Sequence, residues 1–145
     1  YFDANFKRVA SPIVYWGRSL GSFVAAHAAA QVPPSGLILE TAFINKAALM
    51  EEYPQYRCFQ PFARCRLETA APLKGHDFPI LILHGDKDKT VPLRQGQNLY
   101  TQLNEPKEFW RVDGAGHVDI HMVDSASYMR KILDFAARLR PMRVH

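Results

Sequence analysis

The sequence contains little cysteine and no long hydrophobic run, and each of these features excludes a class of protein. Two of its 145 residues are cysteines, Cys58 and Cys65, which are too few for the disulfide framework of a small secreted scaffold. Their spacing would place them roughly 10 Å apart along a helix, too far for a bridge, so we expect free thiols. No apolar run approaches about 18 residues, which excludes a membrane-spanning helix within this chain.

The chain has a positive net charge, but its basic residues are not gathered in one segment. The formal net charge is +4, with 22% charged and 48% hydrophobic residues, as expected of one globular domain. The basic residues are scattered, and the nearest approach to clusters is Arg64 with Arg66, then Arg138, Arg140 and Arg143. No nucleic-acid-binding motif accompanies them, so we interpret the charge as a solvated surface and predict no nucleic-acid partner.

Short apolar segments alternate with helical ones along the chain. Continuous apolar runs typical of buried strands occur at residues 13–16, 37–39 and 80–83, and residues 108–112 are predicted to form a fourth strand. Helices are predicted at residues 20–31 and 93–103, and from Asp124 or Ser125 onward. On the last helix, Tyr128, Ile132, Phe135, Ala136 and Leu139 share one face. This alternation predicts an α/β fold with a parallel sheet of about four strands flanked by helices.

Residues 41–78 interrupt the alternation. They are rich in proline, tyrosine, phenylalanine and arginine, and the segment is too long for an ordinary connection. We predict a packed insertion or a lid-like segment with short helices.

A serine lies at the junction of the first strand and the first helix. Residues 17–21 read Gly-Arg-Ser-Leu-Gly, which matches the Gly-x-Ser-x-Gly pattern of a nucleophile elbow, with Ser19 as the nucleophile. Such a turn is tight, so we expect the glycines at positions 17 and 21 to avoid collisions between helix and strand. The amide of Leu20, at the start of the helix, is a candidate oxyanion donor. The alternative is that Ser19 is a plain helix cap.

A serine hydroxyl needs a base and an orienting carboxylate, and candidates for both follow downstream. Asp86 and Asp88 come directly after the third strand, and His117 comes after the fourth, among glycines. Ligand sites of parallel sheets collect at these carboxyl ends, and the chain order serine, aspartate, histidine fits the pattern. On the residue pattern alone, either Asp86 or Asp88 could be the acid.

Each of these residues also has a structural interpretation. The two aspartates could be turn formers, and His117 could make only a local hydrogen bond. His117 and His121 with the aspartates could be imagined as metal ligands, but the spacing lacks a paired ligand pattern, so we predict no metal. We expect His84, at the end of a strand, to hydrogen-bond locally.

The sequence resembles the α/β-hydrolase superfamily, in particular its branch of small esterases and depalmitoylase-like serine hydrolases. Four stretches carry the resemblance: YWGRSLG at 15–21, LETAF at 39–43, LHGDKDKTVP at 83–92 and GHVD at 116–119. The resemblance implies a triad of Ser19, His117 and Asp88, since the acid is the last residue of the family's His-Gly-x-x-Asp stretch. It also implies an acyl hydrolase that cleaves an ester or thioester of a small molecule or lipid, without a cofactor.

In this family about four strands and the second oxyanion donor precede the elbow. We therefore expect residues 1–145 to be the C-terminal part of such a domain, with an exposed elbow strand, and to be inactive or aggregation-prone alone. An oligopeptidase-type peptidase and a non-catalytic binding protein are the alternative functions. Phe43, Tyr53, Tyr56, Phe59 and Phe62 could line an acyl pocket, or they could be ordinary core.

Overall fold

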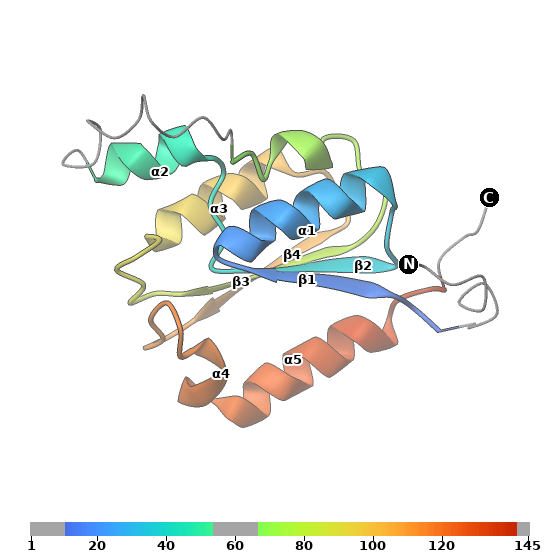
Figure 1. Cartoon of the computed structure of the whole chain (residues 1–145). Coiled ribbons are helices and arrows are strands. Elements are labelled where there is room, and N and C mark those ends of the chain that lie inside the picture. The colour runs from blue at the N-terminus through green and yellow to red at the C-terminus, as the bar shows by residue number, and fades with distance from the viewer. Residues whose placement is uncertain (1–10, 54–66, 142–145) are drawn as a thin grey trace.

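The computed structural model describes residues 11–53 and 67–141. Its centre is a four-stranded sheet whose strands lie side by side in chain order (Figure 1). The strands are β1 (Val14–Arg18), β2 (Gly36–Glu40), β3 (Ile80–Gly85) and β4 (Lys107–Val112). Every neighbouring pair is parallel, so the carboxyl ends of all four strands lie at one edge of the sheet. This confirms the predicted fold class.

Helices cover both faces of this sheet (Figure 1). One face carries α1 (Leu20–Gln31), α2 (Lys46–Glu52), the short 3-10 helix η3 (Ala71–Leu73) and α3 (Leu93–Gln102). The other face carries α4 (Ile120–Val123) and α5 (Ser125–Ala137). Within residues 11–53 and 67–141, no helix is long and apolar enough to cross a membrane.

Two apolar layers hold the sheet between these helices. Successive side chains of a strand point to opposite faces, so Leu39 packs under α1 while Ile38 packs against α5. The α1 side uses small residues, Ala26 and Ala29, which are fully buried and let the helix lie close to the sheet. The α5 side is filled by a large ring, that of Phe135. The strands β2 and β3 are buried throughout, as their apolar runs at residues 37–39 and 80–83 predict, and the burial extends to Glu40 and His84.

The strand that leads to Ser19 lies at one edge of the described sheet. β1 has a mixture of buried and exposed residues, and the Trp16 side chain is 46% exposed. The strand continues through Gly17 and Arg18, two residues beyond the apolar run on which its prediction rested. Backbone pairing with β2 extends to the pair Arg18 and Glu40, and this pairing does not depend on apolar side chains.

The final part of the chain adds one element that the sequence did not predict. The four-residue helix α4 is too short to leave a periodic signal. The predicted cap of the last helix is confirmed at Asp124, whose carboxylate accepts a hydrogen bond from the Ser127 amide at 3.0 Å. Of the predicted irregular segment, α2 and η3 belong to the described residues. Residues 54–66, which include Cys58, Cys65, Tyr56, Phe59 and Phe62, lie outside them.

Candidate active site

Three side chains from three different loops form one hydrogen-bonded row. Ser19 lies between β1 and α1, Asp88 between β3 and α3, and His117 between β4 and α4. The Ser19 hydroxyl lies 2.9 Å from His117 Nε2. On the other side of the ring, His117 Nδ1 lies 2.8 Å from Asp88 Oδ2. The structure therefore brings together the three residues that the sequence singled out, at the carboxyl edge of the sheet.

The backbone of Ser19 is strained. Its φ is 51° and its ψ is −120°, a region that residues with a side chain rarely adopt. The Ser19 amide donates a hydrogen bond to the Glu40 carbonyl oxygen at 2.8 Å, which ties the turn to the end of β2. Strain of this kind is typical of a nucleophile elbow and is not needed for an ordinary helix cap.

The two glycines of the Gly-x-Ser-x-Gly pattern have different roles. A Cβ on Gly17 would lie 2.4 Å from the Gly21 carbonyl oxygen and 2.7 Å from Ser22 Cα, so a side chain cannot fit there. A Cβ on Gly21 would meet nothing within 4 Å. The prediction of a collision is therefore right for Gly17 and wrong for Gly21 within the described residues. The fully buried Ser22, which the sequence analysis did not single out, donates its hydroxyl to the Gly17 carbonyl at 3.0 Å.

The carboxylate of Asp88 is buried but has several donors. Its side chain is 0% exposed, and Oδ1 accepts hydrogen bonds from the amides of Thr90 and Val91, both at 2.8 Å. Together with His117 Nδ1, these donors compensate for the loss of water around the carboxylate. His117 contacts Asp88 and not the other candidate acid, Asp86, whose carboxylate accepts a hydrogen bond from the Gly114 amide at 2.7 Å.

The loop that bears Asp88 is joined to the loop that bears His117. Besides the bond from Gly114 to Asp86, the Lys87 amide donates to the Ala115 carbonyl at 2.8 Å. The two loops are also in close backbone contact, since a Cβ on Gly85 would lie 2.3 Å from the Ala115 oxygen. This role of Asp86 was outside the reach of the sequence, which offers a turn former as its only structural alternative.

His84 lies beneath the acid and is fully buried. Its Nε2 donates to the Val91 carbonyl oxygen at 2.8 Å, which confirms the predicted local hydrogen bond. The same nitrogen is 3.5 Å from Asp88 Oδ2. Burial lowers the pKa of His84 below its ordinary value of 6.5, although the Val91 carbonyl and the Asp88 charge both act in the opposite direction.

The structure also describes three other residues that the sequence analysis named as binding candidates. Leu20 is the first residue of α1, where amides have no partner within the helix, and its side chain is 57% exposed. Phe43 is only 3% exposed, so its part in substrate binding stays a prediction. Tyr53 is not a free pocket wall, because its hydroxyl donates to the carbonyl oxygens of Lys89 and Thr90 in the loop of Asp88.

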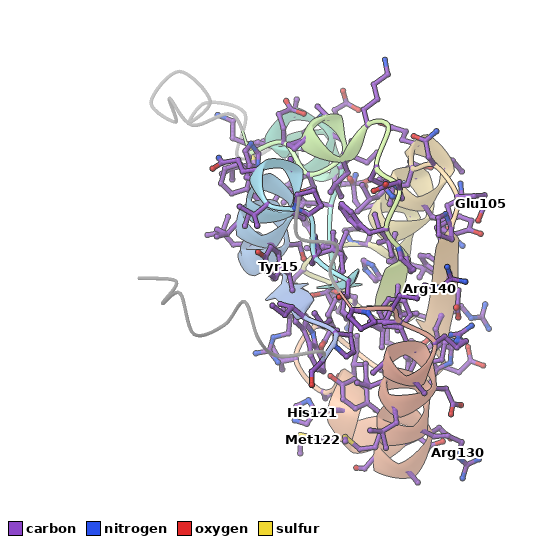
Figure 2. The ribbon with its side chains drawn as sticks, turned by 90° about the vertical axis from the view of Figure 1, so that its right-hand side faces the viewer. Tyr15, Glu105, His121, Met122, Arg130 and Arg140 are labelled. Atoms are coloured by element: carbon purple, nitrogen blue, oxygen red, sulfur yellow. The ribbon has the colours of Figure 1, made fainter. Side chains whose placement is uncertain are left out.

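The second histidine of the imagined metal ligand set, His121, is exposed and lies beside Tyr128. Figure 2 shows His121 and Met122 at the surface of the molecule, and Met122 is 69% exposed. The His121 ring lies 6.2 Å from the Tyr128 ring, centroid to centroid. Among the residues that the structure describes, no group of three or more histidine, cysteine, aspartate or glutamate side chains is arranged to hold a metal ion.

No family model matches the sequence, but individual proteins do. The chain is 31% identical to protein Rv2307c of Mycobacterium tuberculosis, over 85% of this chain and 44% of that protein. It is 26% identical to the lysophosphatidylserine lipase ABHD12 of Rattus norvegicus, over 93% of this chain and 40% of that protein. It is 24% identical to the α/β-hydrolase domain-containing protein 17B of Xenopus laevis, over 87% and 42%. The chain thus spans less than half the length of these relatives.

A solved structure has the same arrangement of strands and helices. The esterase Pf2001 of Pyrococcus furiosus superimposes with a TM-score of 0.71 at 18% identity, over 89% of this chain and 55% of that one. At this identity the likeness shows the fold. The chain belongs to the α/β-hydrolase superfamily. Its described residues form part of the α/β-hydrolase fold, and its similarity is to ester hydrolases in general.

Proposed function

We propose that this α/β-hydrolase chain carries the catalytic triad of a serine hydrolase that cleaves esters or thioesters, with Ser19 as nucleophile, His117 as base and Asp88 as acid. The observation that carries the proposal is the row of contacts from the Ser19 hydroxyl to His117 Nε2 at 2.9 Å and from His117 Nδ1 to Asp88 Oδ2 at 2.8 Å. A carboxylate can only accept, so Nδ1 carries a proton in this row and Nε2 is left as the acceptor for the serine proton.

In the first half of the reaction, Ser19 Oγ forms a bond to the carbonyl carbon while its proton moves to His117 Nε2. The negative charge that develops on the carbonyl oxygen is stabilised by the Leu20 amide. The bond to the leaving group then breaks, His117 donates its proton to the departing alcohol or thiol, and Ser19 is left acylated.

In the second half, water takes the place of the leaving group. His117 accepts a proton from the water as its oxygen attacks the acyl carbon, and then returns the proton to Ser19 Oγ as the acid product leaves. Asp88 holds the imidazole in the required tautomer and stabilises its positive charge in both halves. A second oxyanion donor would lie in the sequence that precedes the elbow strand in the superfamily.

The surroundings of the serine and the relatives both support a substrate with an apolar acyl group. Exposed apolar side chains flank two members of the row: Leu20 is 57% exposed beside Ser19, and Val118 is 62% exposed beside His117. These side chains suit an acyl chain better than a charged group. The rat relative ABHD12 is a lysophosphatidylserine lipase, which supports lipid esters as one class to test.

A fluorophosphonate probe, which labels activated serines, tests the proposal on the full-length protein that contains these residues. Ser19→Ala should abolish labelling, because the nucleophilic oxygen is removed. Ser125→Ala is the matched control, since the Ser125 hydroxyl bonds the His121 carbonyl at the start of α5 and should leave labelling unchanged. Labelling that persists in Ser19→Ala would remove Ser19 from the role of nucleophile.

Hydrolysis of p-nitrophenyl esters of increasing acyl length, beside a lysophospholipid and a peptide, defines the substrate class. We expect turnover of the esters and none of the peptide. Cleavage of the peptide alone would favour an oligopeptidase-type activity. Correctly folded protein that neither labels nor hydrolyses any of these compounds would favour a binding protein.

A further inference from the structure

We propose that His84 is a positioning residue for Asp88, whose carboxylate it holds in place through two contacts of its imidazole ring. The proposal rests on the proposed function, because it assigns a residue that orients the acid of that triad. His84 does not touch Ser19 or the reacting atoms. It acts through two contacts of its Nε2, one with the loop that holds the carboxylate and one with the carboxylate itself.

The first contact connects His84 to Asp88 through Val91. His84 Nε2 donates to the Val91 carbonyl oxygen at 2.8 Å, and the Val91 amide donates to Asp88 Oδ1 at 2.8 Å. Both polar groups of Val91 are therefore used to link the histidine to the carboxylate. A shift of the imidazole moves Val91, and with it one of the two amides that fix Oδ1.

The second contact is direct. His84 Nε2 lies 3.5 Å from Asp88 Oδ2, the oxygen that accepts the hydrogen bond from His117. Both side chains are 0% exposed, so no water can take the place of the imidazole. The His84 ring therefore packs beside the oxygen that His117 contacts.

The protonation of His84 follows from its hydrogen bonds. A carbonyl oxygen only accepts, so the Nε2 bonded to Val91 carries a proton. The other nitrogen, Nδ1, is buried and has no hydrogen-bond partner among the described residues. A proton on Nδ1 would be a buried donor without an acceptor, and burial lowers the pKa of His84 for the same reason. The ring is thus neutral and does not compete with His117 for the charge of Asp88.

Helix α3 packs against the His84 ring and fixes its position. A Cβ on Gly96 would lie 2.3 Å from His84 Nδ1, so the imidazole packs directly against the backbone of α3. Substitution of Gly96 therefore offers a way to displace the ring without changing its chemistry. The charged or titratable groups that face His84 are Asp88 on the loop after its own strand and His117 on the neighbouring loop, while α3 contributes an uncharged glycine.

The test compares variants of the full-length protein by their rate of fluorophosphonate labelling as a function of pH. His84→Leu should lower the rate by about 10- to 100-fold, as expected for a small misplacement of a catalytic group. The inflection of the pH profile should also move to lower pH, because a misplaced Asp88 stabilises the His117 cation less. His84→Gln, which places an amide donor near the position of Nε2, should recover most of the rate. Gly96→Ala should resemble His84→Leu.

His76→Leu is the matched control. His76 is partly buried, whereas His84 is fully buried, but its Nδ1 likewise bonds a backbone carbonyl, that of Phe78 at 2.9 Å, and burial lowers its pKa too. His76 precedes β3 and so lies at the opposite edge of the sheet. This variant should lose stability without a change in the pH profile. A merely structural role of His84 predicts the same result for His84→Leu.

A second measurement keeps the two proposals separate. The proton between His117 and Asp88 should give a low-field resonance in the proton spectrum of the wild type, and this resonance should weaken or shift in His84→Leu and Gly96→Ala. If the wild type is not labelled at all, the proposed function fails, and the resonance still tests His84. If folded His84→Leu and Gly96→Ala keep the wild-type rate, pH profile and resonance, the positioning role of His84 is wrong.

Discussion

The turn that bears Ser19 and the loop that bears Asp88 are fixed in different ways. Ser19 is placed by its backbone, with a φ of 51° and a glycine at position 17 that no other residue can replace without a clash. Asp88 is placed by hydrogen bonds that its carboxylate accepts from the backbone amides of Thr90 and Val91 and from the ring of His117. A substitution that disturbs the backbone of the turn displaces Ser19 entirely, whereas a substitution in the Asp88 loop can remove one hydrogen bond and leave the others in place.

The largest effect should come from Gly17→Ala, which attacks the backbone constraint. The new methyl group would meet the Gly21 carbonyl and Ser22 Cα, so we expect a loss of at least about 3 kcal/mol in the free energy of unfolding, the upper end for overpacking. Fluorophosphonate labelling should disappear. Thermal unfolding and labelling measure the two effects.

Gly21→Ala is the matched control for that experiment, because a Cβ there has open space within the described residues. It should unfold at nearly the wild-type temperature. Equal destabilisation by the two substitutions would contradict the account of a backbone-fixed turn.

A smaller effect should follow from Asp88→Asn, which changes one side chain in the hydrogen-bonded loop. The amide can no longer hold the His117 tautomer, so the rate of ester hydrolysis should fall by about 10⁴-fold, as when a triad aspartate is replaced elsewhere. Circular dichroism should remain that of the wild type. Asp86→Asn should lower the rate by no more than about tenfold, since it weakens one hydrogen bond between loops. A reversal of the two magnitudes would assign the acid to Asp86.

The smallest effect concerns the pH dependence of stability. It should depend on His84, which lies beside the Asp88 loop, and not on Ser19. The pKa of the buried His84 is lower in the folded protein than its ordinary value of 6.5, so the unfolded chain binds more protons below that pH. The contribution of His84 to stability is therefore complete above about pH 6.5 and is lost as the pH falls toward its folded pKa. Melting temperatures between pH 7 and pH 5 should fall less steeply in His84→Gln than in the wild type, while Ser19→Ala should leave the slope unchanged. Identical slopes in all three proteins would mean that His84 does not titrate between the two states.

The sequence predicted the sheet, the main helices and the row of three residues because these depend on local patterns. Apolar runs and the chain order of Ser19, Asp88 and His117 are visible in one dimension. The contacts of Asp86 with Gly114 and of Val91 with His84 are not, since they depend on how two loops meet in space. The pattern of residues alone could not say which of Asp86 and Asp88 lies against His117, because both are aspartates in the same turn.

The ties between the loops of Asp88 and His117 have a mechanical consequence. Through Asp86 and Lys87 these two loops form one body, whereas Ser19 is attached to the end of β2 through Glu40. In the row, the contact between the Ser19 hydroxyl and His117 is the link that joins the two bodies. Within the row, a relative displacement of the two bodies would therefore stretch the contact between Ser19 and His117 and leave the pair of His117 and Asp88 intact. Such a displacement would separate Ser19 from its base while His117 and Asp88 stay paired. Ser19 would become reactive again when the contact re-forms.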